Sequence, residues 1–499
     1  MSGKAEGGSA DSDPNTAEFI GFEYHSDERV SPARYRWEGS STRGWQIQRE
    51  GAHHLDLGPG FRPLRSHRCG VCSTDLDRRF LPFPLPQIIG HEVIALDQVS
   101  RRHVVEINAS HEARGIEHAC PFCLGGLATH CPERRVLGIH DLPGGFGPWV
   151  LAPEAAIIPL PDSISDDAAV LIEPFAAALH AAESIAPSAG ERVAVLGPRR
   201  LGLLVIAALA ALRKRDGTDY KILGLVRRPS MADWALRFGA DEVLQAPDPG
   251  SAAEPCAEFV IDTTGNPLGL ETALMASGRE VHLKSTHGQP SAGLRHTTEL
   301  VVDELTLQAW PEDPDEAKAV VRDSPCRPDD RPRVAWLAST PPPAWLSDRA
   351  DVWAGKDPNA LLKALEDQPS GLPRADLAVV DDEAGIDAVV RPREDEEISL
   401  VRPRGQICTR AGGARTGPLL HALHQRKLRL STSRCGDFEK ALALLVADDE
   451  LAQRLPALIT HRVPATRLPE ALALARTPEC IKVVIEHAET QSLPGTQAD

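Results

Sequence analysis

The chain has 499 residues, of which 42% are hydrophobic and 25% charged, and its formal net charge at pH 7 is -17. This length is too great for one compact core, so we expect two or three domains of a globular protein. The negative charge argues against binding to nucleic acid or to an anionic membrane surface, because both favour basic proteins. No stretch has the roughly 20 apolar residues that a membrane-spanning helix needs, and we expect no such helix.

The two ends of the chain are polar. Residues 1–18 are rich in Gly and Ser and lack the apolar core of a secretory signal, so we predict a disordered tail there and a second polar tail at 488–499. A cytoplasmic location follows from this interpretation. The chain has ten cysteines, several at metal-ligand spacing and the rest scattered, which suits a reducing compartment without disulfides.

Two regions with different patterns follow one another. From residue 19 to 179 the chain shows short β-like runs, such as 104–107 and 150–151, broken by Gly and Pro, which predicts an irregular β-rich domain. From about residue 180 strand and helix patterns alternate, which predicts a parallel Rossmann sheet and an α/β fold class. The expected elements are strands at 192–196, 221–226, 258–262 and 280–286 and helices at 201–212 and 231–238.

A segment at about 311–395, rich in Pro and Asp, interrupts this second region. Within it and just beyond it, residues 375–381 and 406–409 weakly echo residues 257–262 and the strand near His282. A partial internal duplication explains this likeness, and chance similarity between two hydrophobic βα units is the alternative. The segment would add strands to the sheet, cover an interface or lie over the cleft.

Cys72, His91 and Glu173 supply a thiolate, an imidazole and a carboxylate in sequence order. A catalytic zinc ion takes three such protein ligands and keeps a fourth position for water or substrate. Asp75 and Glu92 are candidates to orient the ligands, because ligating side chains are usually held by a carboxylate or carbonyl. The alternative is that Cys72 is a small buried side chain and His91 an ordinary polar residue.

Four features together resemble the zinc-dependent medium-chain dehydrogenase/reductase family, with sorbitol, threonine and glucose dehydrogenases as the nearest branches. They are the stretch 69–92, the cysteine cluster 120–131, the step 171–174 and the glycine-bearing turn after residue 196. The resemblance covers about 400 residues. It implies a GroES-like catalytic domain at 19–179, to which the chain returns at about 455–487, and a Rossmann domain at 180–454 with the insert inside it. The implied enzyme transfers hydride between an alcohol or polyol and NAD or NADP, with zinc acting on the substrate oxygen.

The resemblance also suggests roles for single residues. Thr74 matches the hydroxyl residue that passes the proton outward, and a turn residue bonded to its own backbone is the alternative. Glu92 is placed where it would approach the metal during ligand exchange, and Glu173 matches the carboxylate of the sorbitol-dehydrogenase branch. Cys69 is left out of the site because the family does not use its equivalent.

A second metal site is implied by Cys120, Cys123 and Cys131, which match the last three positions of the family's four-cysteine structural lobe. Glu117 occupies the first position and His118 follows it. A structural zinc held by three cysteines and one of these two residues is our interpretation, and a metal-free loop is the alternative.

The cofactor turn departs from the usual fingerprint. Gly197 and Gly202 keep the first and last glycines, but Arg199 replaces the middle one, where it would either obstruct the pyrophosphate or bind it. Arg227 and Arg228 follow the second strand, where NAD enzymes carry an acidic residue, so we favour NADP over NAD. Thr264 and Gly265 resemble the loop beside the nicotinamide ribose, and residues 284–286 the following strand end.

Two other functions stay open. A non-catalytic descendant that serves as a binding or scaffold protein is suggested by Arg199, Glu117 and the insert, and a metal-independent quinone reductase would share the fold. We expect a small alcohol, polyol or carbonyl substrate and a homodimer or homotetramer. His140 and Asp141 are either substrate contacts or part of a surface loop.

Overall fold

The computed structural model describes residues 15–117, 119–249, 251, 254–285, 288–325, 327, 330–368, 371–396, 398–410 and 417–488. The predicted disorder at 1–18 is wrong for its last residues, because strand β1 begins at Asn15 and pairs along its length with β2. The tail predicted at 488–499 lies outside the described residues after Ala488. Among the described residues, no helix combines the length and apolar character needed to cross a membrane.

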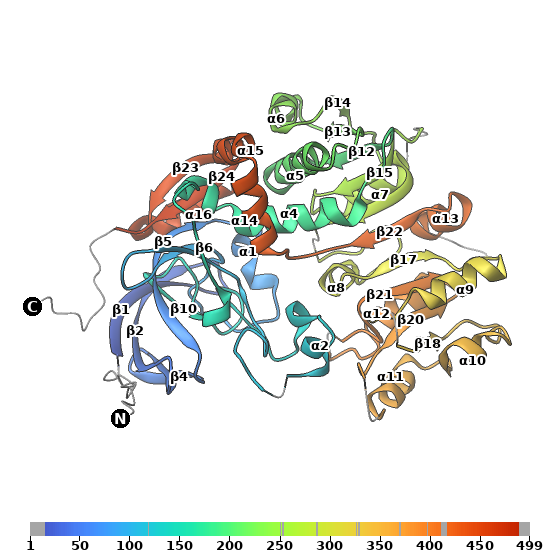
Figure 1. The fold of residues 1–499 in the computed structure, drawn as a ribbon, viewed down its shortest axis with the longest axis horizontal. Helices are drawn as coiled ribbons and strands as arrows, with labels where there is room; N and C mark the ends of the chain where they lie inside the picture. Colours follow the sequence, from blue (N-terminus) through green and yellow to red (C-terminus); the bar gives the residue numbers. More distant parts are fainter. Residues whose placement is uncertain are drawn as a thin grey trace, which may run out of the picture. The chain divides into compact units, whose positions relative to one another are not determined.

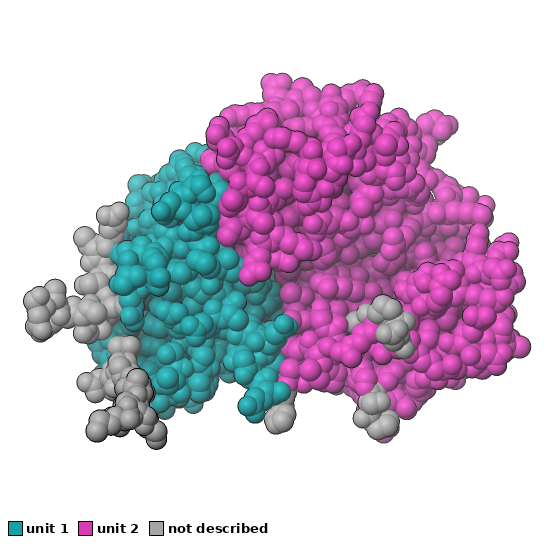
Figure 2. Space-filling model, viewed as in Figure 1, with its two compact units in different colours: residues 1–117, 133–170, 459–499 teal, residues 118–132, 171–458 magenta. Residues whose placement is uncertain are grey.

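The chain forms two compact units, which Figure 2 colours separately. Unit 1 holds residues 1–117, 133–170 and 459–499, and unit 2 holds residues 118–132 and 171–458. The cysteine cluster at 120–131 therefore belongs to unit 2, although it lies within the predicted first domain.

Unit 1 is built from β-sheets with short helices. An antiparallel sheet contains β1 (Asn15–Tyr24), β2 (Val30–Ser40), β3 (Gly44–Arg49) and β4 (Ala52–Leu57). A 7-stranded sheet contains β5 (Phe61–Gly70), β6 (Glu92–Leu96), β7 (Arg102–Val105), β10 (Trp149–Pro153), β11 (Ile157–Pro159), β23 (Ile459–Pro464) and β24 (Lys482–Glu486). The remaining elements are β8 (Asn108–Ala109), β9 (Arg135–Val136), α1 (Ser73–Leu76), α3 (Asp166–Ala169) and α16 (Leu468–Ala475). The end of the chain returns to this unit, since β24 pairs with β5.

Unit 2 is organised around one 11-stranded sheet, whose order is β14-β13-β12-β15-β16-β22-β17-β21-β20-β18-β19 (Figure 1). Its strands are β12 (Arg192–Leu196), β13 (Lys221–Val226), β14 (Glu242–Gln245), β15 (Ala257–Asp262), β16 (Ser277–Leu283), β17 (Thr306–Ala309), β18 (Arg333–Trp336), β19 (Asp351–Ala354), β20 (Ala375–Val380), β21 (Val401–Thr409) and β22 (Arg429–Thr432). Its helices are α2 (Pro121–Leu124), α4 (Ile172–Ile185), α5 (Arg200–Asp216), α6 (Ala232–Phe238), α7 (Pro267–Ala276), α8 (Thr297–Val302), α9 (Pro314–Arg322), α10 (Leu346–Arg349), α11 (Pro358–Glu366), α12 (Glu383–Val390), α13 (Pro418–Gln425), α14 (Phe438–Ala447) and α15 (Asp449–Arg454). The predicted strands at 192–196 and 221–226 are confirmed residue for residue.

The insert adds strands to the sheet, which is one of the three roles considered for it. It contributes β18, β19 and β20, which continue the sheet beyond β21. The echo in the sequence has a structural counterpart, because β20, α12 and β21 follow one another as β15, α7 and β16 do. The order of strands around β18 repeats the order around β12, and this agreement supports the internal duplication over chance similarity.

The two halves of this sheet exchange their last strands. β17 follows β16 in the chain but pairs in parallel with β21, whereas β22 follows β21 but pairs in parallel with β16. The exchanged strands meet antiparallel at Leu307 and Leu430, and all other neighbours in the sheet run parallel. One hydrophobic core cluster contains residues from both halves, including Val281 and Ile407. The halves therefore share a core and a sheet.

Candidate active site

Cys72 lies in the turn that leads from β5 into α1, where it caps the N-terminus of that short helix. Its backbone N–H donates to Oδ2 of Asp75 over 2.8 Å, which fixes the turn. Its Sγ lies 3.7 Å from Oγ1 of Thr74, and both side chains are half-buried. The turn thus places a thiol and a hydroxyl side by side.

Asp75 connects this turn to the residues that precede β6. Its carboxylate is 1% exposed, accepts a hydrogen bond from the N–H of Gly90 over 3.2 Å and lies 3.3 Å from Nδ1 of His91. Burial lowers the pKa of His91, but the Asp75 carboxylate outweighs this effect and raises the pKa well above its usual value. Because Nδ1 faces Asp75, Nε2 is the nitrogen that a metal would take.

Glu92 is buried beside a cation that the sequence analysis missed. Its carboxylate forms an ion pair with Nζ of Lys482, which lies at the start of β24, and both side chains are almost fully enclosed. A Cβ on Gly70 would collide with the Glu92 carboxylate and approach Cε of Lys482 at 3.0 Å, so only glycine leaves room for this pair. A lysine directly before the apolar residues 483–485 was the available signal.

The three candidate ligand atoms in unit 1 converge. One atom each from Cys72, His91 and Glu92 lies within 4.8 Å of the other two, which suits a single ion with bonds of about 2.0–2.3 Å. Cys69 is fully buried, and burial raises the pKa of its thiol well above the usual value, so it remains a neutral thiol. Glu173 belongs to unit 2, where it lies partly buried in the first turn of α4.

The cysteine cluster of unit 2 is compact. Sγ of Cys120 lies 3.7 Å from Sγ of Cys123 and 3.8 Å from Sγ of Cys131, and none of the three cysteines forms a disulfide. Sulfur atoms bound to one tetrahedral zinc at about 2.3 Å lie about 3.8 Å apart, so these separations suit a zinc ion. Glu117, the predicted first ligand, is exposed in unit 1, and His118 lies outside the described residues.

A buried histidine upstream of these cysteines was missed. His111 in unit 1 is 5% exposed, and its Nε2 lies 3.0 Å from Oε2 of Glu133. Its burial and residue type make it a third candidate for the fourth ligand, beside Glu117 and His118. Its place nine residues before Cys120 was the sequence signal.

The glycines of the cofactor turn are required by close packing. Gly197 has a φ of 77°, and a Cβ there would meet Cγ2 of Thr264 at 2.7 Å. A Cβ on Gly202 would meet Oγ1 of Thr263 at 2.6 Å, while that hydroxyl donates to the carbonyl of Leu196 over 2.9 Å. The turn after β12 and the loop after β15 therefore touch, as they do where such sheets bind dinucleotides.

Arg199 is accommodated without left-handed backbone. Its φ is -115°, its N–H donates to the carbonyl of Gly197 over 2.7 Å, and its own carbonyl accepts from Leu203 over 2.8 Å. The residue thus caps the N-terminus of α5 with a negative φ. At the neighbouring loop, the hydroxyl of Thr264 donates to Oδ1 of Asp262 over 2.7 Å, and burial raises the pKa of Asp262 to about 6.

The two arginines after β13 are exposed. Nη2 of Arg227 donates to Oγ1 of Thr272 over 3.1 Å, and its Nη1 lies 3.9 Å from Asp248. Within the part of the chain that the structure describes, Arg228 forms no ion pair with a carboxylate. Both arginines remain candidates for a 2′-phosphate.

Buried polar side chains at the end of β16 were only partly anticipated. Lys284 follows the last residue of that strand, is 6% exposed, and donates from Nζ to Oγ of Ser433 over 3.1 Å. Burial lowers the pKa of Lys284 to about 8. Nearby, Glu304 accepts from Nε of Arg404 over 2.6 Å and from the N–H of Arg434 over 2.9 Å.

His140, Asp141 and a pocket in unit 2 were also considered as parts of a site. The ring of His140 stacks on Phe83 with centroids 4.6 Å apart, and Asp141 lies 3.5 Å from Nε of Arg135, which favours the surface-loop interpretation.

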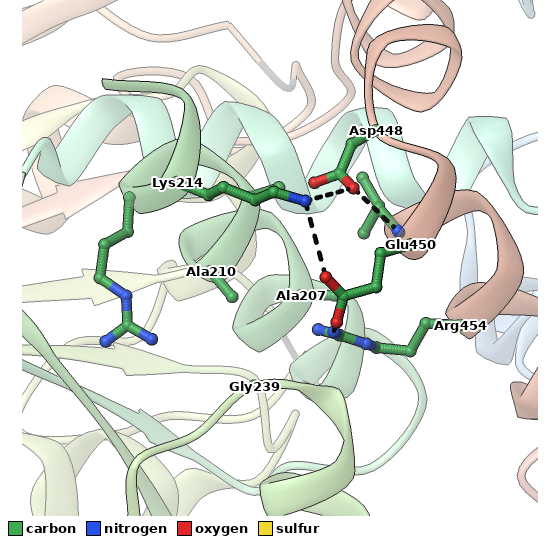
Figure 3. A pocket seen from close by; sticks show the side chains of 10 residues that line it. Ala207, Ala210, Lys214, Gly239, Asp448, Glu450 and Arg454 are labelled. Atoms are coloured by element: carbon green, nitrogen blue, oxygen red, sulfur yellow. Dashed lines mark hydrogen bonds and ion pairs between the residues drawn. The ribbon is translucent and has the colours of Figure 1, made fainter. Parts of the chain in front are cut away.

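A pocket in unit 2, shown in Figure 3, is lined by the last turns of α5 and by α15. Its charges are paired, since Lys214 lies 2.9 Å from Asp448, and the C-terminal end of α5 is remote from the strand ends that bind ligands.

Comparison with known proteins agrees with this geometry. Residues 59–162 match the family model described as Alcohol dehydrogenase GroES-like domain. L-threonine 3-dehydrogenase of Rhizobium etli (strain CIAT 652) is 31% identical over 234 residues, which are 45% of this chain and 64% of that enzyme. L-galactonate-5-dehydrogenase of Escherichia coli (strain K12) is 31% identical over 211 residues, which are 40% of this chain and 60% of that enzyme. The chain thus spans less than two thirds of the length of these curated relatives.

A solved structure extends the likeness over almost the whole chain. L-idonate 5-dehydrogenase from Escherichia coli K-12 superposes with a TM-score of 0.55 at 14% identity and covers 95% of this chain and 100% of its own. The chain therefore has the fold of a GroES-like unit joined to a Rossmann-type unit. The match over residues 59–162 agrees with the expected resemblance to the zinc-dependent medium-chain dehydrogenase/reductase family.

Proposed function

We propose that this protein is a zinc-dependent, NAD(P)-linked dehydrogenase that transfers hydride between an alcohol or polyol and the nicotinamide. The convergence of Cys72, His91 and Glu92 around the orienting carboxylate of Asp75 carries the proposal. A structural role alone leaves the convergence of a thiol, an imidazole and a carboxylate unexplained, because these are the ligand types that zinc takes.

The catalytic ligands in this proposal are Cys72, His91 and Glu173. Zinc bound there would act as a Lewis acid and lower the pKa of the substrate hydroxyl. Asp75 lies beside Nδ1 of His91, which leaves Nε2 for the metal. Lys482 forms an ion pair with Glu92, whose carboxylate would bind the metal when another ligand leaves it. Thr74, beside Cys72, takes the proton of the substrate hydroxyl and passes it outward.

A second zinc is proposed for the cysteine cluster of unit 2. The sulfur separations support it, and Glu117, His118 and His111 are the candidates for its fourth ligand. A closed four-ligand site of this kind stabilises a loop and carries out no chemistry.

NADP is the proposed cofactor, with NAD as the alternative. Gly197, Gly202 and the Thr264-Gly265 loop would accommodate its pyrophosphate and ribose, and Arg199 would add a cation at the N-terminus of α5. Arg227 and Arg228 would bind the 2′-phosphate.

We propose a homodimer or homotetramer in the cytoplasm, where thiol ligands stay reduced. The edge of β22 is already paired with β17, so self-association would use another surface than this strand edge. Light scattering of the purified protein and cell fractionation test these two points.

Elemental analysis combined with nicotinamide fluorescence tests the main proposal. We expect two zinc ions per chain, fluorescence enhancement with NADPH, and turnover of at least one member of an alcohol and polyol panel. Cys72→Ser should lose one zinc and all turnover, while Cys131→Ser should lose one zinc and mainly stability. Cys256→Ser, a half-buried cysteine outside both clusters, is the matched control and should keep both ions.

The same measurements would reveal the non-catalytic alternative. A protein that holds zinc but binds neither NADPH nor NADH at millimolar concentration would be a scaffold in which Arg199 blocks the cofactor turn. Full turnover by Cys72→Ser would instead favour metal-independent reduction.

A further inference from the structure

A ladder of polar side chains crosses the buried face of two neighbouring strands, β16 and β22. Residues 280 and 282 of β16 pair in register with residues 429 and 431 of β22, and residues 284 and 433 follow the two strand ends on the same side. Central parallel strands are normally apolar on both faces, because unpaired polar groups there are costly. The ladder consists of Glu280, His282, Lys284, Arg429, Ser431 and Ser433, of which all but Arg429 are buried.

The hydrogen bonds of this ladder form one continuous chain. Nζ of Lys284 lies 3.1 Å from Oγ of Ser433, which lies 2.8 Å from Nε2 of His282. Nδ1 of His282 lies 2.8 Å from Oγ of Ser431, which donates to Oε1 of Glu280 over 2.5 Å. Hydrogen bonds therefore connect Lys284 to Glu280 without interruption.

The identity of the end groups fixes the direction of these bonds. An ammonium can only donate and an ionised carboxylate can only accept, so the Ser431 proton points to Glu280 and the Ser433 proton to Nε2 of His282. His282 must then be neutral and carry its proton on Nδ1. Burial and the charge of Lys284 lower the pKa of His282 well below its usual value, which agrees with a neutral ring.

The two ends of the ladder lie in different surroundings. Lys284 lies at the carboxyl end of β16, the edge where sheets of this type bind their ligands. Charged or titratable groups that act on it are Glu304, Cys435, Glu173 and Arg434, and those that act on His282 also include His180 and Arg429. At the other end, Nη1 of Arg429 lies 3.3 Å from Glu280, and the Arg429 side chain is 46% exposed to solvent.

We propose that this ladder conducts the proton that alcohol oxidation releases, from Lys284 at the cofactor edge to Glu280 beside solvent. The inference rests on the proposed dehydrogenase function and adds a second proton route to the one assigned to Thr74. It makes Lys284 a further catalytic residue, and His282 and Ser433 the groups through which it acts.

The step balances as follows. The alcohol carbon gives a hydride to the nicotinamide and the carbonyl product forms, while the hydroxyl proton goes to the Lys284 amine that one transfer along the ladder has left neutral. That transfer starts from the Lys284 ammonium, which gives a proton to Ser433; Ser433 gives its own to Nε2 of His282, and Nδ1 of His282 gives its proton to Ser431. Ser431 protonates the Glu280 carboxylate, which releases the proton to water, and rotation of the hydroxyls and of the imidazole ring restores the starting orientation.

The direction of the hydrogen bonds in the ladder can be tested in the resting protein, without catalysis. In protein labelled with ¹⁵N-histidine at pH 7.5, the His282 signals, assigned by their loss in His282→Gln, should show a neutral ring protonated at Nδ1. Ser431→Ala should move these signals, because it removes the acceptor of the Nδ1 proton. An imidazolium, or a ring protonated at Nε2, would overturn the proposed direction.

Conduction is tested with Ser433→Ala and the matched control Thr432→Val. Thr432 is a buried hydroxyl residue on the same strand, but it donates to the carbonyls of Leu300 and Leu305 on the other side. Ser433→Ala leaves the Thr74 route alone to carry the proton, so kcat should fall about 10- to 100-fold and the solvent deuterium isotope effect should increase, while the NADPH dissociation constant stays unchanged.

If Ser433→Ala and Thr432→Val have the same kcat and the same solvent isotope effect, the ladder does not conduct the proton. Should Ser433→Ala fail to fold, Ser431→Ala interrupts the same chain further from the cofactor edge and should show the same loss. A wild-type protein without any dehydrogenase activity would refute the proposed function, whereas an active wild type with an unaffected Ser433→Ala would refute only the ladder.

Discussion

The two halves of the 11-stranded sheet have the same strand order, but they differ in the segment that follows the first strand. In the half around β12, the first strand is followed by Gly197 and Gly202, which pack against the loop after β15. In the half around β18, the first strand ends in Trp336, followed by Leu337 and a run of prolines at 341–343. The second half has thus kept the sheet without the glycine turn at which we propose that the first half binds the cofactor phosphate. Architecture and binding are separable properties of this fold.

The second half contributes packing in place of a cofactor turn. Trp310 lies edge-on to Trp336 with centroids 5.4 Å apart and parallel to Trp345 at 6.4 Å. The guanidinium of Arg410 lies 5.9 Å from the Trp336 ring. Aromatic packing thus surrounds the end of β18, the strand that corresponds to β12 in the first half.

The largest expected effect is at the junction of the halves. Leu430→Ala should destabilise the protein by about 2–5 kcal/mol, because it opens a cavity where the exchanged strands meet. If the halves share one core, chemical denaturation followed by tryptophan fluorescence and by far-UV circular dichroism should give coincident single transitions. Separate transitions would show that the second half is an independent domain. Leu268→Ala, at a half-exposed leucine, is the control and should change stability little.

Glu304 should make the junction sensitive to acid. Burial raises the pKa of Glu304, but Arg404, His130 and His180 outweigh it and lower the pKa to about 2 from 4.5. A lowered folded-state pKa means stability that is present above pH 4.5 and lost as the pH falls towards 2, amounting to about 3 kcal/mol at most. Glu304→Gln should remove this part of the dependence when unfolding is measured from pH 6 to pH 3. An unchanged dependence would contradict the role of Glu304.

Glycine substitutions should separate backbone strain from cofactor binding. Gly197 and Gly217 both have positive φ, 77° and 64°, but an added Cβ meets Thr264 at the first and nothing within 4 Å at the second. Gly217→Ala should lose about 1 kcal/mol of stability, and Gly197→Ala should lose more, because its added Cβ also collides with Thr264. Gly197→Ala alone should weaken NADPH binding, by tenfold or more, in a fluorescence titration. Equal binding by both variants would place the cofactor elsewhere.

The smallest expected effect concerns cofactor choice. Arg228→Ala should weaken NADPH binding three- to tenfold and leave NADH binding unchanged, because it removes one exposed partner of the 2′-phosphate. Arg410→Ala makes the same change in charge on the second half and should affect neither cofactor. A parallel loss of NADH affinity would contradict a role for Arg228 at the 2′-phosphate.

Local patterns in the sequence predicted much of this fold. The strands at 192–196 and 221–226 are apolar runs bounded by polar residues, and they formed as expected. The exchange of β17 and β22 could not be predicted, because each strand would satisfy the same hydrophobic pattern beside either neighbour. Register between strands far apart in the chain is set by the packing of the whole core.

The same limit applies to the candidate site. The spacing of Cys72, Asp75 and His91 anticipated residues that the fold brings together, because two of them share one short turn. Lys482 reaches Glu92 only through the return of the chain to unit 1. The ladder on β16 and β22 depends on the pairing of exchanged strands, and no local pattern contains that pairing.

The exchanged strands also constrain how such a gene can change length. Ending the chain after β17 would remove β22 and expose the edge of β16, and starting it at β18 would leave β21 without β17. The five strands from β17 to β21 are nevertheless continuous in the sequence, and they pair with the rest of the sheet at Leu307 and Leu430. A change of length that keeps β22 beside β16 would therefore add or remove this run as one nested segment.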